Sequence, residues 1–479
     1  MTAPWSEQVV AVHATSDRTA VEDPAGPVSG RELIGRATTA AELLAGLGTD
    51  EGRPVPALLT TSADALALVV GGAAADRPVA PLGPRLTAAE LAGPVRGTGS
   101  PVLLTEAAWR PLAEQVAAAS GVRVVTLAPL RASAARPPVP RGPVALYLHT
   151  SGTTGAAKRV PFTQEVLAAR TAVLAPAAGF GPDSRYATGS PLHHIGGLGN
   201  TMAALSVGAA IVPTTRFTLD WWRGLAERGA THGLLVPSMI EMLLDAGLLD
   251  AVGLQTLIYG ASPISPATLR RVLDVLPRVR LVQQFGQTEG SPITWLTPED
   301  HARALAGAPH LLDSVGRPVT GLRLRLDDPD EHGVGEVLAA APHLSVHAED
   351  GWLHTGDLGR IDDEGYLYLS GRRNDMVIRG GENVYPLEVE NVLADHPGLA
   401  AAGVVGVPDR RLGEVLAAFV VPVDPACPPA DEELRRHVRS RLAGFKVPAC
   451  WHHVAELPLN SAGKLSRRDL LRQHAAHVS

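Results

Sequence analysis

The sequence predicts an α/β protein with a large N-terminal domain of α/β layers, residues 1–373, and a smaller, mobile α+β domain, residues 374–479. Three observations support this prediction. Between residues 30 and 130, helix-like stretches alternate with short apolar runs, which is typical of helices packed on a mostly parallel sheet. A second α/β stretch covers residues 146–369. Beyond it, the remaining residues have the pattern of a compact unit of their own.

The elements of the first stretch follow from the spacing of its apolar residues. We expect helices at residues 31–47, 87–95 and 107–119, and we interpret the apolar runs at residues 66–70 and 122–127 as strands. Residues 130–142 are rich in Pro, Arg and Ala without periodicity, so they are expected to form a loop.

The C-terminal unit carries its own start and stop signals. Pro386 suits the first position of a helix, because the N–H that proline lacks is not needed there, and His-Pro-Gly at residues 396–398 ends that helix. The further elements are strands at residues 402–407 and 415–423, and a helix capped by Asp431 with Leu434, Val438 and Leu442 spaced by four. The domain boundary is placed at residues 371–375, where a Gly and four polar or charged residues interrupt the apolar pattern.

Composition excludes several classes of function. Lys and Arg number 42 against 49 Asp and Glu, a net charge of −7, so no overall positive field attracts nucleic acid or an anionic membrane. The two cysteines, Cys427 and Cys450, are too few for a disulfide framework and are expected to be reduced thiols. The N-terminus lacks the pattern of a signal peptide, and no apolar run reaches the roughly 18 residues of a membrane span. We therefore expect a cytoplasmic protein.

A short apolar strand from Leu146 leads into a loop that suits a polyphosphate. Glycines let backbone amides approach phosphate oxygens, hydroxyls donate hydrogen bonds, and Lys158 supplies a positive charge. A Walker P-loop is excluded, because Ala157 precedes the lysine and Arg159 follows it. The alternative is a plain turn between strand and helix. The candidate phosphate-binding residues are Thr150, Ser151, Gly152, Thr153, Thr154, Gly155 and Lys158.

Together with four further motifs, this loop resembles the adenylate-forming superfamily of acyl-CoA synthetases, amino-acid adenylation domains and luciferases. The motifs occur in the order found in that family: 150–158, Phe-Gly-Gln-Thr-Glu at 285–289, Thr-Gly-Asp at 355–357, Gly-Arg-Arg-Asn-Asp at 371–375 continuing to Arg-Gly-Gly-Glu-Asn-Val-Tyr-Pro at 379–386, and Asn-Ser-Ala-Gly-Lys at 460–464. The resemblance is strong over residues 146–467. The first 145 residues resemble the family only in their general α/β pattern.

The resemblance implies how MgATP is bound. Thr288 is expected to touch the α-phosphate and Glu289 to hold Mg²⁺, a hard cation that prefers oxygen ligands. An exposed Glu in a turn is the structural alternative. Phe285, followed by Gly286, stands where the family usually has Tyr, so that a ring can still stack on adenine. Gly260 and Ala261 belong to a segment that resembles the loop along the nucleotide and acyl site, although by itself it could be a plain turn.

Two further motifs are expected to contact ATP directly. By the resemblance, Asp357 and Arg372 bind the ribose; the Asp has acceptors for both hydroxyls and the Arg adds donors from the domain boundary. Lys464 lies in a predicted loop near the C-terminus, where a solvated surface charge is the ordinary interpretation. In the family this lysine is catalytic. An ammonium there stabilises the negative charge that gathers when a carboxylate meets the α-phosphate.

The His-His pair at residues 193–194 resembles an acyl-CoA synthetase segment. By its spacing, His194 is the family histidine at the wall between the acyl pocket and the phosphate site, and His193 occupies the usual aromatic position. The pair could also suggest a metal site. Neighbours on one strand, however, point to opposite faces, and no Cys or carboxylate lies nearby at ligand spacing.

The resemblance also implies a two-step cycle. The small domain would pivot at Asn374, where the family usually has Asp or Lys, and would then place Gly380 and Gly381 along the channel of an incoming thiol. Glycines permit close approach of a pantetheine arm. This chain differs from the family pattern at the hinge and at the phosphate loop. The hinge loses its charge at Asn374, and Ala157 and Arg159 flank the lysine of the phosphate loop.

The substrate expected from these residues is a non-α-amino carboxylic acid. Amino-acid adenylation domains have an Asp directly after a Phe, whereas this chain reads Phe-Thr-Leu-Asp at 217–220. An unpaired buried ammonium would cost several kcal/mol. We expect a free-standing ligase that uses ATP and Mg²⁺ and transfers the acyl group to CoA. Open alternatives are an enzyme that loads the phosphopantetheine of an acyl-carrier protein, and a non-catalytic nucleotide-binding protein.

Overall fold

The computed structural model describes residues 3–478, except for residues 151–157, 215, 347, 381 and 460–463. Several predicted site residues therefore lie outside the described residues. They are Ser151, Gly152, Thr153, Thr154 and Gly155 of the phosphate loop, Gly381, and residues 460–463 before Lys464.

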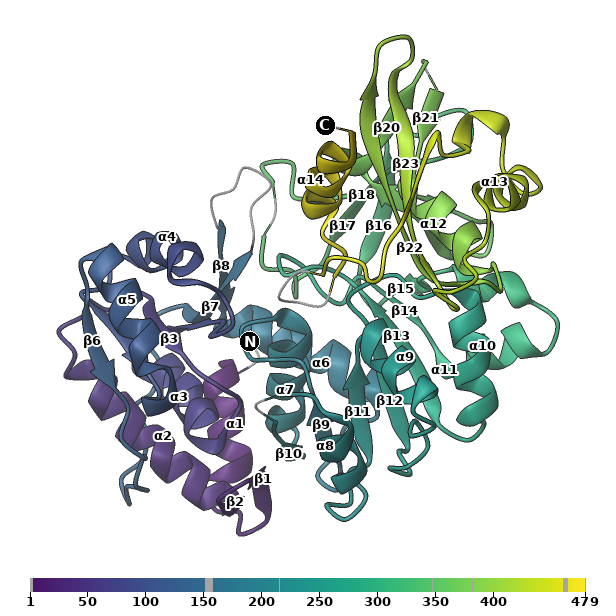
Figure 1. Cartoon of the computed structure of the whole chain (residues 1–479). Helices are drawn as coiled ribbons and strands as arrows, with labels where there is room; N and C mark the ends of the chain where they lie inside the picture. Colours follow the sequence, from purple (N-terminus) through teal and green to yellow (C-terminus); the bar gives the residue numbers. More distant parts are fainter. Residues whose placement is uncertain are drawn as a thin grey trace.

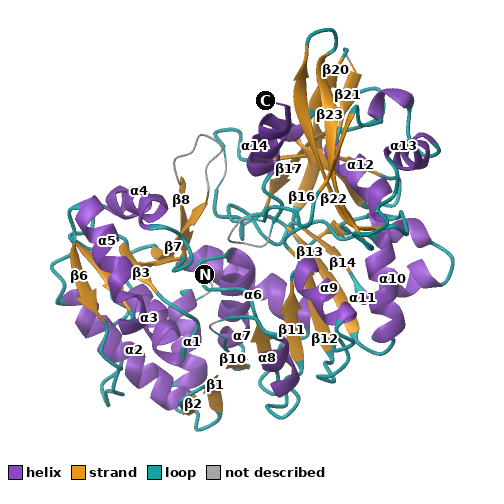
Figure 2. Cartoon of the chain, in the orientation of Figure 1, coloured by secondary structure: helices purple, strands orange, loops and turns teal. Residues whose placement is uncertain are grey.

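Two mostly parallel sheets form the framework of the large domain (Figures 1 and 2). The six-stranded sheet has the order β6 (Arg123–Thr126), β5 (Val102–Thr105), β3 (Val55–Leu58), β4 (Val79–Leu82), β7 (Val144–Thr150), β8 (Lys158–Thr163). The nine-stranded sheet has the order β15 (Arg317–Pro318), β14 (Thr294–Leu296), β13 (Arg280–Phe285), β12 (Thr256–Gly260), β11 (His232–Leu235), β9 (Arg185–Thr188), β10 (Ala210–Val212), β1 (Thr19–Asp23), β2 (Gly26–Ser29). Antiparallel pairs occur at their edges: β7–β8, β1–β2, β13–β14 and β14–β15.

Helices cover both sheets (Figure 2). Their bounds are α1 (Trp5–His13), α2 (Gly30–Ala45), α3 (Ala63–Ala74), α4 (Ala88–Thr98), η1 (Ala107–Trp109), α5 (Arg110–Ser120), α6 (Gln164–Ala178), α7 (Ile195–Ser206), α8 (Leu219–Gly224), α9 (Pro237–Asp245), α10 (Pro266–Val275), α11 (Pro298–Leu305) and η2 (Pro309–Asp313). The largest apolar core joins α1–α3 to β7, α6 and α7, so it ties the two sheets together. Among the described residues, no helix has the length and hydrophobicity needed to cross a membrane.

The predicted helices of the first stretch are confirmed, but one predicted strand is wrong. Residues 66–70 lie inside α3, which is buried along its whole length. A fully buried helix is apolar on every side, so periodicity alone does not separate a short piece of it from a buried strand. The deciding signal is the N-cap: the Ser62 hydroxyl accepts a hydrogen bond from the Ala65 N–H. The predicted strand at residues 122–127 corresponds to β6.

Two smaller sheets complete the molecule. One is antiparallel, β16 (Arg323–Asp327), β17 (Gly335–Ala340), β18 (Leu353–Ile361) and β19 (Leu367–Arg372). After η3 (Arg373–Asp375) comes the sheet of the C-terminal domain, with strands β20 (Val377–Arg379), β21 (Glu382–Val384), β22 (Leu399–Asp409), β23 (Gly413–Pro422) and β24 (Cys450–His453). Its helices are α12 (Pro386–Ala394), α13 (Asp431–Arg439), η4 (Gly444–Lys446) and α14 (Arg467–Val478). The α/β fold with a large and a small domain is thus confirmed.

The prediction for α13 is correct in position but wrong in its cap. The N-cap is Ala430, no side chain caps the helix, and Asp431 is the first helical residue, whose carboxylate lies 3.0 Å from His453 Nε2. Leu442 follows the end of the helix in a turn. A carboxylate in the first turn still suits the positive end of the helix dipole, so the sequence signal located the helix although the hydrogen bond differs.

Candidate active site

Asp357 and Arg372 are cross-strand partners on β18 and β19, with Arg372 Nε 3.0 Å from Asp357 Oδ1. Asp357 is buried and Arg372 is exposed. Burial raises the pKa of Asp357, while the nearby positive charges of Arg372 and Lys464 oppose that rise. Two residues fifteen positions apart in sequence are thus held together by strand register.

The buried carboxylate of Glu336, which sequence reasoning missed, organises this corner. It is 7% exposed, accepts a hydrogen bond from the Gly356 N–H at 3.0 Å and pairs with Arg373 Nη1 at 2.8 Å. Glu336 therefore fixes the β18 backbone just before Asp357 and the side chain of Arg373 beside Asn374. A Glu in a strand gives no signal of this role, because its partners come from a later strand, β18, and from the turn η3.

The Thr288–Glu289 segment forms a tight turn after β13. The N–H groups of Gln287 and Gly290 each donate to the other's carbonyl, at 2.8 and 3.1 Å. Thr150 Oγ1, at the end of β7, is 3.4 Å from Glu289 Oε1. The end of the strand that leads into the phosphate loop therefore meets the predicted magnesium ligand, although the two are far apart in sequence.

Strands β12 and β13 end side by side at this turn. Gly260 has a φ of +152°, and a Cβ there would lie 2.2 Å from the Gln284 carbonyl oxygen, so no larger residue fits. Ala261 follows with a φ of +70°, a left-handed conformation that is uncommon for a residue other than glycine. Phe285, half-buried, is the last residue of β13, and Gly286 packs closely on Ser291. The structure thus brings these predicted nucleotide-site residues together at the carboxyl ends of β12 and β13.

Another missed feature is a buried chain of amides beneath this edge. The Asn200 side chain on α7 donates to the Gly196 carbonyl at 3.0 Å and to Gln284 Oε1 at 3.1 Å, and Gln284 Nε2 donates to Ser291 Oγ at 2.9 Å. Asn200 is fully buried. The chain links the turn that carries His194 to the segment after Glu289. In the sequence, the one available sign of this network was Asn200 itself, a polar residue among the apolar residues of α7.

The expected geometry of the two histidines is wrong. They lie in a turn before α7, with His194 at the N-cap, and their ring centroids are 4.3 Å apart rather than on opposite faces. Burial lowers the pKa of His194 to about 4, with further lowering by the charges of Lys464 and Arg85. The pKa of His193 is also well below its usual value because of burial. Both rings are therefore neutral at pH 7.

Lys464, on the small domain, lies close to residues of the large domain. The residue keeps an exposed surface, but lost hydration lowers the pKa of its ammonium, the charge of Arg372 lowers it further, and Asp357 opposes both. The influence of Lys464 on the pKa of His194 places the histidine turn in the same neighbourhood. The charge of Lys464 therefore acts on both His194 and Asp357, and Asp357 is in contact with Arg372.

Gly380, predicted to line the thiol channel, and Asn374, the predicted hinge residue, lie in two turns that flank strand β20. Gly380, with a φ of +62°, forms the turn between β20 and β21 and is exposed. Figure 1 shows this hairpin at the end of the small domain that is remote from β7 and β8. Asn374 is an exposed residue of the single turn η3 between β19 and β20. The Lys464 segment, and not the glycine hairpin, is therefore at the site in this orientation.

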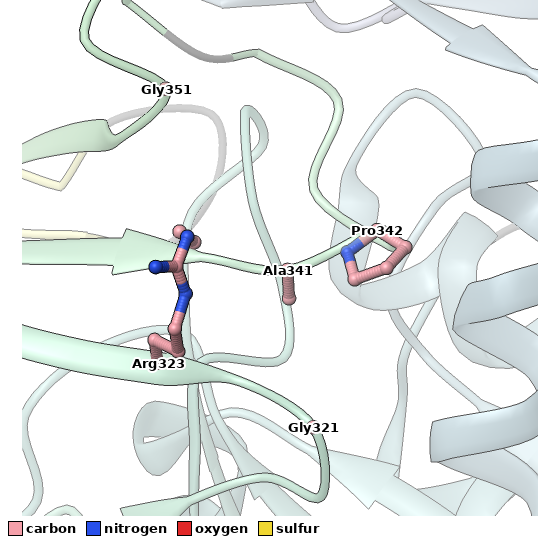
Figure 3. A pocket seen from close by; sticks show the side chains of 6 residues that line it. Gly321, Arg323, Ala341, Pro342 and Gly351 are labelled. Atoms are coloured by element: carbon pink, nitrogen blue, oxygen red, sulfur yellow. The ribbon is translucent and has the colours of Figure 1, made fainter.

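One surface hollow lies apart from these residues. It has a volume of about 580 Å³ and is lined by Gly321, Arg323, Ala340, Ala341, Pro342 and Gly351 (Figure 3). The figure shows the Arg323 side chain rising from its strand beside Ala341. None of the predicted site residues lines this hollow, so its size does not identify the active site.

Comparison with known proteins decides the family. Residues 8–345 match the model of the AMP-binding enzyme family, and residues 388–464 match the AMP-binding enzyme C-terminal domain. The chain belongs to the AMP-binding enzyme family. It is 34% identical, over 84% of its length and 83% of the relative, to the fatty acid–[acyl-carrier-protein] ligase ScoC of Streptomyces coeruleorubidus. It is 32% identical to a 2-succinylbenzoate–CoA ligase of Bacillus licheniformis, over 95% of this chain and 97% of that one.

A solved structure is similar to this protein over nearly the whole chain. The amide bond synthetase McbA of Marinactinospora thermotolerans superposes with a TM-score of 0.87 at 28% identity, covering 98% of this chain and 100% of that one. The adenylate-forming superfamily assignment is therefore confirmed, and the protein is an AMP-forming ligase of the acyl-CoA synthetase type.

Proposed function

We propose that the protein converts a non-α-amino carboxylic acid into its acyl adenylate and transfers the acyl group to the pantetheine thiol of CoA in the cytoplasm. The observation that carries this proposal is the meeting of Lys464 with Asp357, Arg372 and His194. In the first step the carboxylate attacks the α-phosphorus of ATP and pyrophosphate leaves. In the second, the thiol attacks the acyl carbon and AMP leaves.

The residues present divide the binding of ATP among them. Asp357 and Arg372 take the ribose hydroxyls, Phe285 supplies a ring face to adenine, and Thr288 donates to the α-phosphate. Lys158 and the preceding loop hold the outer phosphates. Lys464 stabilises the charge that develops between carboxylate and phosphate, since a positive group already in place needs no reorganisation.

A divalent cation fits at Glu289. Its carboxylate and the Thr150 hydroxyl, 3.4 Å away, are the hard oxygen donors that Mg²⁺ prefers. When bound, the cation neutralises phosphate charge and favours the departure of pyrophosphate. The role of the protein residues is to orient the phosphate oxygens at this turn.

The environment of Phe217 supports a substrate without an α-ammonium. The Phe217 ring packs against Gly189 and near Trp221 and Trp222. The nearest acid in this motif, Asp220, has a side chain 91% exposed and pairs with Arg223 at 3.1 Å. A carboxylate that already faces solvent and an arginine is not placed to bind a buried ammonium.

The acceptor is tested by product analysis. Purified protein is incubated with MgATP, a panel of carboxylic acids that includes aryl, fatty and α-amino members, and then CoA, a phosphopantetheinylated carrier protein or a simple amine. We expect pyrophosphate release with a non-amino acid and a CoA thioester by mass spectrometry. A loaded carrier protein with no CoA thioester would favour the alternative suggested by the relative ScoC. An amide product alone would overturn the thiol proposal, and no pyrophosphate with any acid would overturn the function.

Asp357→Asn is expected to weaken ATP binding specifically. The change removes the charge from two hydrogen bonds to the ribose, and charged hydrogen bonds contribute roughly 1.5–3 kcal/mol each. We expect the KM for ATP to rise about 10- to 100-fold, with the KM for the acid within about twofold, in a pyrophosphate-release assay. Asp363→Asn, at an exposed residue of the turn between β18 and β19, is a matched control. An equal rise in both KM values would show that Asp357 acts on the fold and not on the nucleotide.

A further inference from the structure

Lys464 needs a firm attachment, because it is held on a surface loop of a domain that turns. The chain has only three lysines, Lys158, Lys446 and Lys464, in a total of 42 Lys and Arg. A weak bridge between Leu459 and Leu465, and a hydrogen bond from the Ser466 N–H to the Pro458 carbonyl at 2.8 Å, close the base of the Lys464 loop. These contacts join residues on either side of Lys464 and do not reach the hinge.

Arg467, three residues after the catalytic lysine, makes that attachment. Its Nε lies 2.9 Å from Asp375 Oδ2, in the hinge turn η3, and its Nη1 lies 2.5 Å from Glu390 Oε1 on α12. Nη1 also donates to the Val404 carbonyl on β22 at 2.7 Å. One guanidinium therefore joins the start of α14 to the hinge, a helix and the central sheet of the small domain.

The surroundings make this clamp more than a surface ion pair. Arg467 is 24% exposed, Glu390 12% and Asp375 33%. Glu390 Oε1 also accepts the Val404 N–H at 2.8 Å, so the carboxylate is itself fixed to the backbone. Burial alone would lower the pKa of Arg467, but the two carboxylates outweigh it and raise the pKa. The planar fork of arginine can serve all these acceptors at once, and an ammonium cannot.

We propose that Arg467 is a positioning residue for Lys464: it fastens the lysine loop to Asp375 in the hinge turn, so that rotation of the small domain carries the ammonium to and from the site as a rigid unit. This inference rests on the proposed function. Because Lys464 acts in adenylation, we expect loss of the clamp to affect that step most and acyl transfer little. Reactions that depend on geometry lose about 100-fold for a displacement near 1 Å.

The test compares the two half-reactions in Arg467→Met and Arg467→Lys, measured below their melting temperatures. We expect pyrophosphate release to fall about 100-fold in Arg467→Met, with thiol transfer from preformed acyl-AMP within about threefold. Arg467→Lys should recover part of the loss. Arg472→Met is the matched control on the same helix, because Arg472 is exposed and, within the part of the chain that the structure describes, pairs along the helix with Asp469 at 3.1 Å. It should leave both half-reactions unchanged.

A second readout follows Lys464 itself. After reductive methylation with ¹³C-formaldehyde, the three lysines give few NMR signals, and the Lys464 signal is assigned by its absence in Lys464→Ala. Its pKa lies below the usual value in the native protein because of lost hydration and Arg372. In Arg467→Met we expect it to return towards that value. If Arg467→Met does not fold, Asp375→Asn, which removes only the hinge contact, is tested in the same way and should shift both readouts in the same direction.

The outcomes separate this inference from the proposed function. A native enzyme that releases no pyrophosphate would overturn the function. A native enzyme that works, together with a clamp variant that retains adenylation and an unchanged Lys464 pKa, would overturn the role of Arg467. An equal loss in both half-reactions would also overturn it, because that pattern indicates general damage to the small domain.

Discussion

Replacing Lys464 by Ala is expected to lower the rate of pyrophosphate release about 10²- to 10³-fold or more, with ATP binding retained. The charge of Lys464 acts on Asp357 and His194, and in the proposed function it is one of several groups that hold ATP, so we expect the ground state to lose little. The transition state gathers negative charge between carboxylate and phosphate, and removing one preorganised group there costs roughly this factor.

The measurement pairs pyrophosphate release with calorimetric titration of ATP. Acyl transfer from preformed acyl-AMP to the thiol should remain within about threefold, because the lysine acts only in the first step. Lys464→Arg should not restore the rate, since a planar guanidinium does not replace a compact charge in a confined space. Unchanged adenylation in Lys464→Ala would remove Lys464 from the mechanism.

Asn374→Pro should separate the two half-reactions in the opposite sense. The structure holds Asn374 in the single helical turn η3, where the φ that proline imposes is close to the one expected for such a turn. The ring therefore preserves the orientation that brings Lys464 to the site and restricts the pivot away from it. We expect adenylation to stay within a few-fold of the native rate while thiol transfer from preformed acyl-AMP falls about 100-fold.

Asn374→Ala is the matched control, because it removes the same side chain without fixing φ. It should retain both half-reactions, since the native Asn374 is exposed. If Asn374→Pro lowers both half-reactions equally, residue 374 is not the pivot, and the domain boundary proposed at this position must be moved.

The separation of Lys464 from Gly380 gives these two predictions a common structural basis. Lys464 lies at the site, and the β20–β21 turn lies at the remote end of the small domain (Figure 1). One orientation therefore cannot present both segments to the same substrate. Variants at the lysine and at the hinge should consequently affect opposite steps.

The sequence by itself determined the family and the two-domain α/β fold, and it predicted the residue types of the site. The site residues could be predicted because phosphate, ribose and metal binding require particular groups at short, contiguous spacing, and Thr288–Glu289 and the Gly-Arg pair at residues 371–372 match such spacing. Helix starts were also readable where local chemistry sets them, as for Pro386 in α12. The phosphate loop at residues 151–155 stays a prediction, because it lies outside the described residues.

Only the tertiary structure decided which of these groups meet and what supports them. The apolar run at 66–70 fits either a helix or a strand, and its place within the capped helix α3 decides for the helix. The adjacent histidine rings lie close together because they are in a turn and not on a strand. Glu336 and Arg467 gave no signal in the sequence, since the value of a buried charge depends on partners supplied by distant strands and helices. Motifs and helix starts depend on neighbouring residues and can be found in the sequence, whereas burial and charge pairing exist only once the chain has folded.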